Sequence, residues 1–272
     1  MPNICVITGG AAGIGHALAK ACVTRGDAVI MVDIDELNVK KMAESLTELG
    51  PGVARGVQLD VTCAADVEGI VKEVVAEYGK LDYFFNNAGV AVSGEVRDLN
   101  LEHWKKVLDV NLVGVINGCH AVYPVMVAQR SGHIINIASL AGLIPFVTNA
   151  PYSASKHAVV GLSNTLRLEG ETLGVRVSVV CPGFVKTDIY DSSDAINVNK
   201  DKLNESIPFT AISADIAALK ILNGVKKNQG VIIFPFYAKL LWWVNRLSSR
   251  LAAPLARKMI ADFRKLRDKE MR

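Results

Sequence analysis

The sequence predicts an α/β fold in which helices cover both faces of a doubly wound parallel sheet. Short β-branched runs alternate along the chain with longer stretches of helical periodicity, a pattern typical of strand–helix–strand units. Runs rich in β-branched residues, such as Val175 to Val180, suit strands that are covered on both sides. A chain of 272 residues, 50% of them hydrophobic, can bury a full core, and α/β folds of this size commonly form one domain.

Seven short runs have the composition of strands. The first predicted helix, Ala17 to Thr24, follows the first of these runs, Ile4 to Thr8. The predicted strands are Ile4 to Thr8, Ala28 to Val32, Gly56 to Leu59, Tyr83 to Phe85, His133 to Ile137, Val175 to Val180 and Val231 to Phe234. The polar stretch Asp188 to Glu205 resembles a mobile loop. We expect a nucleotide-binding catalytic domain over residues 1–235 and a helical extension over residues 236–272.

A glycine-rich turn follows the first strand and precedes the first helix. It reads Thr8-Gly9-Gly10-Ala11-Ala12-Gly13-Ile14-Gly15. Its glycines allow a ligand to approach the backbone closely, and the helix that follows presents unpaired N–H groups to a pyrophosphate. The spacing differs from the GxGxxG fingerprint, and a purely structural turn would share these features.

Asp33 ends the second predicted strand, where the ribose of an adenosine presents its hydroxyl groups. A carboxylate there accepts hydrogen bonds from a free diol and repels the additional phosphate of NADP. The neighbouring Ala12 and Ile34 supply no positive charge. NAD is therefore the expected cofactor, although Asp33 could also serve as an ordinary turn or helix-capping residue.

Tyr152 and Lys156 are four residues apart on a helix expected to start near Pro151, so they lie on the same side of it. A nearby ammonium group favours the phenolate and would lower the tyrosine pKa from its ordinary value of about 10. Ser139 follows the fifth predicted strand and could donate to a substrate oxygen or only cap a turn. Taken alone, Tyr152 could be a core residue of an amphipathic helix, and Asn111 could simply hydrogen-bond backbone groups in a helix.

Together these segments resemble the short-chain dehydrogenase/reductase family, from roughly Asn3 to Phe234. The matching motifs are the glycine turn (TGxxxGxG), Asn86-Asn87-Ala88-Gly89 (NNAG), the tetrad Asn111, Ser139, Tyr152 and Lys156, and Pro182-Gly183 with Thr187. The resemblance implies a Rossmann-type fold and a dimer or tetramer.

The resemblance also implies roles for these residues. Tyr152 is the acid or base, Ser139 orients the substrate oxygen, Lys156 lowers the tyrosine pKa and binds the nicotinamide ribose, and Asn111 holds a water in a proton relay. The implied cofactor-binding residues are Gly9, Ala12, Gly13, Ile14, Gly15, Asp33, Ile34, Asp60, Val61, Asn87, Ala88, Gly89, Tyr152, Lys156, Pro182, Gly183, Val185 and Thr187. For Asn87, stabilising the turn is as plausible as direct contact, and Val185 could equally be an anchored loop residue.

The stretch Leu140 to Val147 is almost wholly apolar and lies between two of the tetrad residues. We therefore expect a lipophilic secondary alcohol or ketone as substrate, such as a steroid, a terpenoid or a fatty-chain molecule. Core packing would explain the same apolar stretch. Two alternatives remain: a catalytically silent NAD-sensing or interaction protein on the same fold, and an NAD-using epimerase or dehydratase, which would not release net NADH.

The extension carries an apolar repeat with basic residues on other faces. The repeat comprises Leu240, Val244, Leu247, Leu251, Leu255, Met259, Phe263 and Leu266. Pro254 is expected to divide it into two helices. With Trp242 and Trp243, such a segment could lie on a membrane surface, or it could pack on the domain, at the pocket mouth or against another subunit.

Charge and cysteine content limit the other possibilities. From Lys239 to Arg272 there are ten Lys or Arg and three Asp or Glu, a local charge of +7 in a chain of net charge +3. This concentration in the extension argues against a protein that coats nucleic acid.

Five scattered cysteines form no disulfide framework, and the histidines show no metal-ligand spacing, so no metal is expected. Without a visible signal peptide or an uninterrupted apolar stretch of about 20 residues, a cytoplasmic location and no spanning helix are expected.

Overall fold

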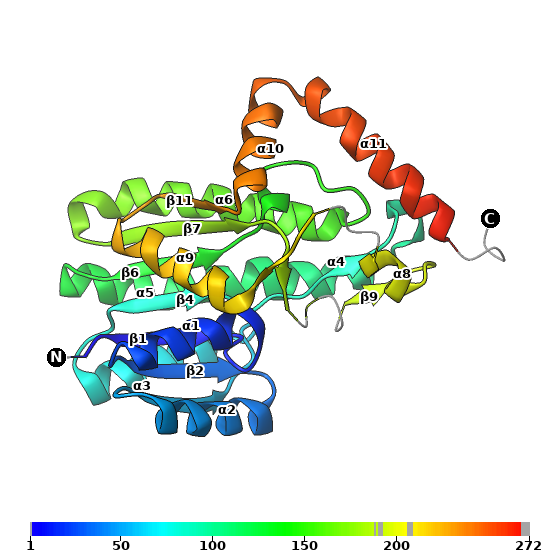
Figure 1. The fold of residues 1–272 in the computed structure, drawn as a ribbon. Helices are drawn as coiled ribbons and strands as arrows, with labels where there is room; N and C mark the ends of the chain where they lie inside the picture. Colours follow the sequence, from blue (N-terminus) through cyan, green and yellow to red (C-terminus); the bar gives the residue numbers. More distant parts are fainter. Residues whose placement is uncertain (1, 188, 190–192, 206–208, 268–272) are drawn as a thin grey trace.

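The computed structural model describes residues 2–187, 189, 193–205 and 209–267. A parallel seven-stranded sheet runs through the molecule in the order β11-β7-β6-β4-β1-β2-β3 (Figure 1). The strands are β1 (Ile4–Thr8), β2 (Ala28–Asp33), β3 (Val53–Gln58), β4 (Tyr83–Asn86), β6 (His133–Ile137), β7 (Arg176–Pro182) and β11 (Val231–Phe234). The predicted doubly wound α/β fold is confirmed, and the observed strands overlap all seven expected runs.

Helices cover the two faces of this sheet. One face is covered by α1 (Gly13–Thr24), α2 (Glu36–Leu49) and α9 (Ala214–Lys226). The other is covered by α3 (Ala64–Tyr78), α5 (Gly114–Gln129) and α6 (Ala150–Gly170). Strands such as β6 are buried at every position because both of their faces meet a helix layer.

Shorter elements surround the carboxyl ends of the strands. They are β5 (Val92–Ser93), η1 (Val96–Asp98), α4 (Leu101–Leu108), η2 (Asp109–Val113), η3 (Leu140–Gly142), β8 (Val185–Lys186), β9 (Asp194–Ala195), α8 (Lys200–Glu205) and β10 (Ile212–Ser213). The turn η4 (Glu171–Leu173) lies at the opposite edge of the sheet, between the end of α6 and the start of β7. Within the stretch 188–205, β9 pairs with β5 and α8 is helical, so parts of the expected loop have regular structure, and its mobility stays a prediction. Asp188 and residues 190–192 lie outside the described residues.

The helices α4 and α5, with η2 between them, form one continuous helical run, Leu101–Gln129, that is long and apolar enough to cross a membrane by length and composition. Its α5 part places Val115, Cys119, Val122 and Met126 in the core against the sheet. We assign the run to the core of the domain, because such buried helices satisfy the same criterion as spanning ones.

The extension forms α10 (Phe236–Leu247) and α11 (Ser249–Leu266). Figure 1 shows α10 projecting from the end of β11 and α11 returning along the side on which the strands end. The expected division at Pro254 is wrong: the helices separate at Ser248, whose backbone is extended (φ −162°, ψ 119°), and Pro254 lies inside α11. An exposed proline early in a helix forfeits one backbone hydrogen bond, which this helix accommodates.

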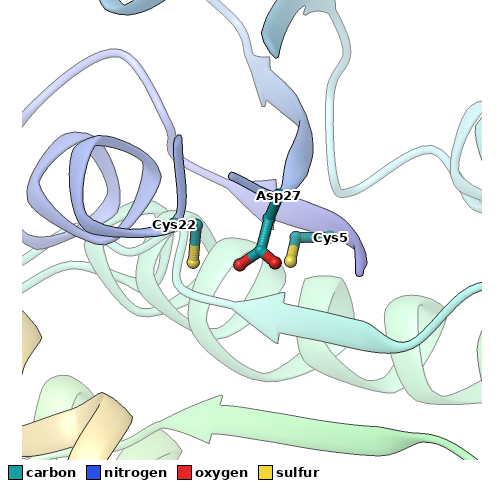
Figure 2. A group of neighbouring side chains, drawn as sticks. All are labelled: Cys5, Cys22 and Asp27. Atoms are coloured by element: carbon teal, nitrogen blue, oxygen red, sulfur yellow. The ribbon is translucent and has the colours of Figure 1, made fainter. Parts of the chain in front are cut away.

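Two thiols and a carboxylate meet at the amino end of the sheet, where Cys5, Cys22 and Asp27 place their ligand atoms within 4.8 Å of one another (Figure 2). Asp27 Oδ1 already accepts a hydrogen bond from Asn3 Nδ2 at 2.7 Å, and Oδ2 accepts from Arg25 Nε at 2.7 Å. The neighbouring Cys22 thiol and burial raise the pKa of Cys5, which keeps the thiol protonated. We assign this cluster to packing, and the expectation of no metal stays a prediction.

Candidate active site

A cavity of about 910 Å³ lies at the carboxyl ends of the strands, next to the point between β1 and β4 where the sheet order reverses. Ligands bind at this place in doubly wound sheets. Eighteen of the predicted site residues line it: Gly9, Ala12, Gly13, Ile14, Asp33, Ile34, Asp60, Val61, Asn87, Ala88, Gly89, Ser139, Tyr152, Lys156, Pro182, Gly183, Val185 and Thr187. Gly15 and Asn111 do not line the cavity and act from behind it.

The glycine turn has the geometry of a pyrophosphate cradle. Gly9 and Gly13 adopt left-handed backbone angles (φ +63° and +53°), which side chains disfavour. A Cβ on Gly15 would lie 2.1 Å from the carbonyl oxygen of Gly9, so the first turn of α1 packs directly against the strand end. Ala12, the N-cap of α1, supplies no side-chain acceptor, which leaves the first N–H groups of the helix available to an anion.

Thr8 and Asn87 hold the glycine turn in place. The Asn87 side-chain amide donates to the carbonyl oxygens of Thr8 (2.9 Å) and Gly9 (3.1 Å). The Thr8 hydroxyl oxygen accepts from the backbone N–H groups of Asn87 (2.9 Å) and Ala88 (3.0 Å). The stabilising role of Asn87 is therefore present in the structure, at the edge of the same cavity.

The carboxylates on the adenosine side are partly engaged by the backbone. Asp33 Oδ2 accepts from the N–H of Ala11 at 3.1 Å, and Oδ1 accepts from the N–H of Asp35 at 3.2 Å. These contacts fix the carboxylate at the cavity and leave it further lone pairs for ribose hydroxyls. Asp60 Oδ1 accepts from both the N–H and the hydroxyl of Thr62, so this residue also shapes the local turn.

The helix α6 brings Tyr152 and Lys156 together as expected. It begins at Ala150 with Pro151 in its first turn, where proline is tolerated. Lys156 Nζ lies 5.6 Å from the centre of the Tyr152 ring. It also donates to the carbonyl oxygen of Ile137, at the end of β6, over 2.8 Å. This bond fixes the ammonium group below the cavity.

Burial controls the protonation of this pair. It raises the pKa of Tyr152, and a hydrogen bond with Ser139 opposes the rise. Burial also lowers the pKa of Lys156 from 10.5 to about 8, while the nearby Cys181 thiol acts the other way. Burial is the largest cause of the shift, so the pKa of Tyr152 lies above its ordinary value. The expected lowering of this pKa by Lys156 stays a prediction.

Ser139 and Asn111 support the pair from two elements. Ser139 lies two residues after the end of β6 and caps η3, and its hydroxyl oxygen accepts from the N–H of Ala141 at 3.1 Å. Asn111 lies in the π-helical turn η2 and is fully buried. Its side chain accepts from the N–H of Val90 (2.8 Å) and donates to the carbonyl of Val90 (2.9 Å). The Asn111 side chain thus fixes the segment after Gly89, and its role in holding a water stays a prediction.

The segment after β7 faces the glycine turn across the cavity. A Cβ on Gly13 would lie 3.1 Å from Thr187 Cγ2, so these two residues are in near contact. Val185 is buried and pairs with β10, which makes it an anchor of this segment as well as a lining residue. The Tyr237 hydroxyl oxygen accepts from the N–H of Phe184 at 2.7 Å and ties α10 to the same turn.

The other end of the cavity carries large apolar side chains, and Lys258 and Asp262 of α11 line the cavity as well. The pocket mouth was one of the places expected for the extension, and α11 supplies part of this wall. The apolar lining includes Phe146, Val147, Phe184, Leu255, Met259 and Phe263. The last three belong to α11, and they were visible in the sequence only as members of an apolar repeat. Helical periodicity shows that a face is apolar but not what it covers.

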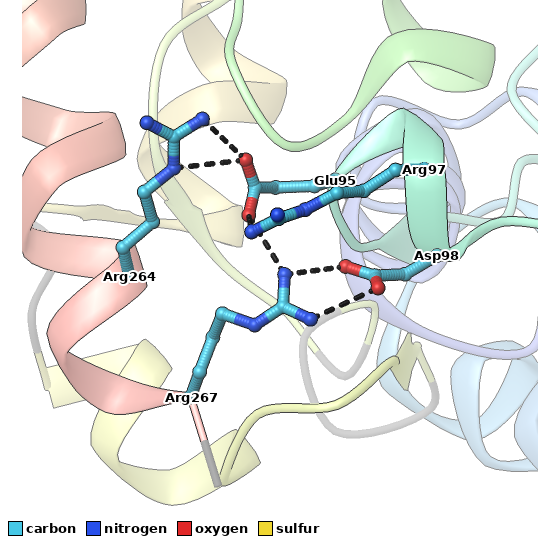
Figure 3. Close-up of polar contacts among 5 residues, drawn as sticks. All are labelled: Glu95, Arg97, Asp98, Arg264 and Arg267. Atoms are coloured by element: carbon cyan, nitrogen blue, oxygen red, sulfur yellow. Dashed lines mark hydrogen bonds and ion pairs between the residues drawn. The ribbon is translucent and has the colours of Figure 1, made fainter. Parts of the chain in front are cut away.

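Five charged side chains fasten α11 beside the cavity (Figure 3). Glu95 Oε1 accepts from Arg264 Nε (2.9 Å) and Nη2 (2.7 Å), and Oε2 accepts from Arg97 Nη2 (2.7 Å) and Arg267 Nη1 (2.8 Å). Arg267 also binds Asp98 through two bonds of 2.7 and 3.0 Å. These contacts, led by Arg264, lower the pKa of Glu95 from 4.5 to about 2. We call these five residues the Glu95 cluster.

Known proteins share this architecture. Residues 3–197 match the family model for short chain dehydrogenases. An uncharacterized oxidoreductase of Staphylococcus epidermidis is 34% identical over 192 residues, which cover 71% of this chain and 82% of the relative.

Two solved structures extend the similarity over most of the chain. A short-chain dehydrogenase/reductase from Burkholderia phymatum, in complex with NAD, superposes with a TM-score of 0.84 at 28% identity and covers 92% of this chain and 95% of its own. A short-chain dehydrogenase from Sphingobium yanoikuyae, in complex with NADPH, has a TM-score of 0.78 at 25% identity and covers 94% and 95%. Sequence and fold therefore agree that the chain belongs to the short-chain dehydrogenase/reductase family of oxidoreductases.

Proposed function

We propose that this oxidoreductase interconverts a lipophilic secondary alcohol and its ketone, with NAD as the preferred cofactor. The observation that carries the proposal is the single cavity of about 910 Å³, which joins the glycine turn, the Tyr152 pair and the apolar wall formed with α11. Its volume lies near the upper end of the range of about 300–1,000 Å³ for ligand sites. Cofactor and substrate can therefore meet in one cavity.

The residues around Tyr152 suit proton transfer to or from a substrate oxygen. Because burial holds the pKa of Tyr152 above its ordinary value, the phenol is protonated near neutral pH and donates to a carbonyl oxygen. Ser139 presents a hydroxyl beside it, in position to stabilise charge on that oxygen. Lys156 is a buried ammonium whose pKa of about 8 lets it release a proton close to neutral pH. A bound nicotinamide would supply the hydride acceptor or donor.

The preference for NAD rests on Asp33. Its carboxylate lies at the cavity and accepts one backbone bond through each oxygen, and a phosphate at this position would face a like charge. Solved relatives bind NAD in one case and NADPH in another, so the family alone does not decide between them. We expect a higher kcat/KM with NAD than with NADP. The variant Asp33→Asn should reduce this preference, measured as kcat/KM with NAD divided by kcat/KM with NADP. A wild-type preference for NADP would contradict this assignment.

The reaction is tested by following NADH absorbance with a panel of lipophilic secondary alcohols, comparing wild type with Tyr152→Phe. We expect the loss of the phenolic proton to reduce kcat by about 10²- to 10⁴-fold. Tyr78→Phe is the matched control, because it removes the same hydroxyl from α3, outside the cavity lining. Equal turnover by wild type and Tyr152→Phe would overturn the proposal, and NAD reduction by the wild type would separate it from an epimerase or a silent NAD sensor.

A further inference from the structure

The helix α10 has one face against the domain and one face in solvent. Tyr237, Ala238, Leu241 and Trp242 pack on the core cluster beneath the helix. The outer face exposes large apolar side chains instead: Phe236 (80% exposed), Leu240 (53%), Trp243 (54%) and Leu247 (78%), followed by Leu251 (66%) at the start of α11. We call these five residues the outer stripe.

The outer stripe is continuous. At 3.6 residues per turn, its four α10 members fall within an arc of about 60° of the helix. Scattered exposed leucines are ordinary, but a contiguous apolar row marks a surface that contacts something. Ala238 on the inner face is completely buried, so α10 does not need to rotate for its apolar residues to find the core.

The charge around the outer stripe has one sign. Between Phe236 and Ala261 the chain contains five Lys or Arg and no Asp or Glu. Lys239 and Arg246 are exposed, and their positions place both on one edge of the stripe. Arg250 is exposed beside Leu251. An apolar stripe with a basic edge complements a surface that carries negative charges on the outside and apolar groups below them.

We propose that α10 docks on an anionic lipid bilayer, with the outer stripe in the interface and Lys239, Arg246 and Arg250 at the headgroups. An amphipathic helix with aromatic and leucine side chains on one face and cations beside them lies in the interface plane in this way. A second copy of the chain fits less well in an antiparallel contact, because a two-fold axis across the helix would bring the basic edges of both copies together.

Docking here would bring the substrate end of the cavity close to the lipid. The helix α11 begins directly after α10 and lines the cavity through Leu255, Met259 and Phe263. The docking inference does not depend on the proposed reaction, since it rests on α10 alone and can be measured without turnover.

The test is flotation of the full-length protein with vesicles of phosphatidylcholine containing phosphatidylglycerol, and with vesicles of phosphatidylcholine alone. We expect binding to the anionic vesicles, weakening as salt is raised, and little binding to the neutral ones. The double variant Leu240→Glu, Leu247→Glu should reduce the partition coefficient at least tenfold. The matched control, Ile216→Glu with Leu219→Glu, places the same charges on exposed positions of α9 (47% and 63%) and should leave binding unchanged.

A second pair of variants tests the charges. Lys239→Gln with Arg246→Gln should lower anionic-vesicle binding by roughly five-fold per residue, whereas Lys226→Gln with Lys227→Gln, exposed at the end of α9, should not. Circular dichroism confirms that each variant is folded. Failure of the wild type to float with anionic vesicles, or equal flotation of the Leu240/Leu247 variant, would overturn the proposal. A fall in oligomer mass in that variant with unchanged vesicle binding would assign the stripe to self-association instead.

Discussion

Glu95→Gln is expected to loosen α11 from the domain without unfolding the sheet. The substitution keeps the size of the side chain but removes the charge that receives four hydrogen bonds from Arg97, Arg264 and Arg267. The displacement of the Glu95 pKa from 4.5 to about 2 corresponds to about 3 kcal/mol. Because the Arg97 and Arg264 side chains are 63% and 57% exposed, solvent screening reduces this figure, and we expect a loss of about 2 kcal/mol.

Hydrogen–deuterium exchange resolves where this loss occurs. A loss of about 2 kcal/mol predicts roughly 30-fold faster exchange of α11 amides that open locally, with β1 and β4 unchanged. Glu68→Gln is the control, because its Lys72 partner is 76% exposed and such a pair contributes little. Equal exchange of α11 in the two variants would refute the reasoning.

The same carboxylate predicts a pH dependence. Its folded pKa is depressed, so its contribution is fully present above pH 4.5 and is lost as pH falls toward about 2. Protection of α11 in the wild type should therefore decline across this acid range. Glu95→Gln should lack that component of the decline, and an identical acid profile in wild type and variant would assign the cluster no role in holding α11.

Two further predictions concern the cofactor turn and the buried lysine. Gly15→Ala should abolish the stabilisation of the protein by NAD in a thermal shift assay, because the added Cβ would lie 2.1 Å from a backbone oxygen. The control is Gly69→Ala on α3, where an added Cβ would have nothing within 4 Å. This variant should stabilise the protein by up to about 1 kcal/mol. For Lys156, the unfolded chain binds more protons than the folded one between pH of about 8 and 10.5, so its contribution to stability rises with pH in that window. Urea unfolding at pH 7.5 and 9.5 should show wild type gaining about 2 kcal/mol relative to Lys156→Met, and parallel changes would contradict the lowered lysine pKa.

The sheet was predictable because each strand carries its own local signal. Val175 to Val180 and the β6 segment are rich in β-branched residues, and the structure places them within a few residues of the expected bounds. The cavity was predictable for a related reason. Parallel strands bring their carboxyl ends to one edge, so Gly9, Asp33 and Ser139 converge there although they are distant in sequence.

Two features depended on tertiary contacts and could not be derived from sequence pattern. The protonation of Tyr152 and Lys156 depends on how deeply the pair is buried, and spacing along a helix does not report burial. The separation of α10 from α11 occurs at Ser248, while Pro254 continues inside a helix. Proline marks where a helix loses a hydrogen bond, but packing on either side decides where the chain turns.

The turn at Ser248 explains how one apolar repeat serves two surfaces. In a single straight helix, Leu240 and Leu247 would share a face with Leu255 and Met259. Because the chain changes direction at Ser248, the first pair faces solvent and the second lines the cavity. The Glu95 cluster holds the C-terminal end of α11 against the domain. The outer stripe of α10 lies at the opposite end of the extension. Loosening the cluster and blocking the outer stripe should therefore have separable effects, the first on α11 exchange and the second on vesicle binding.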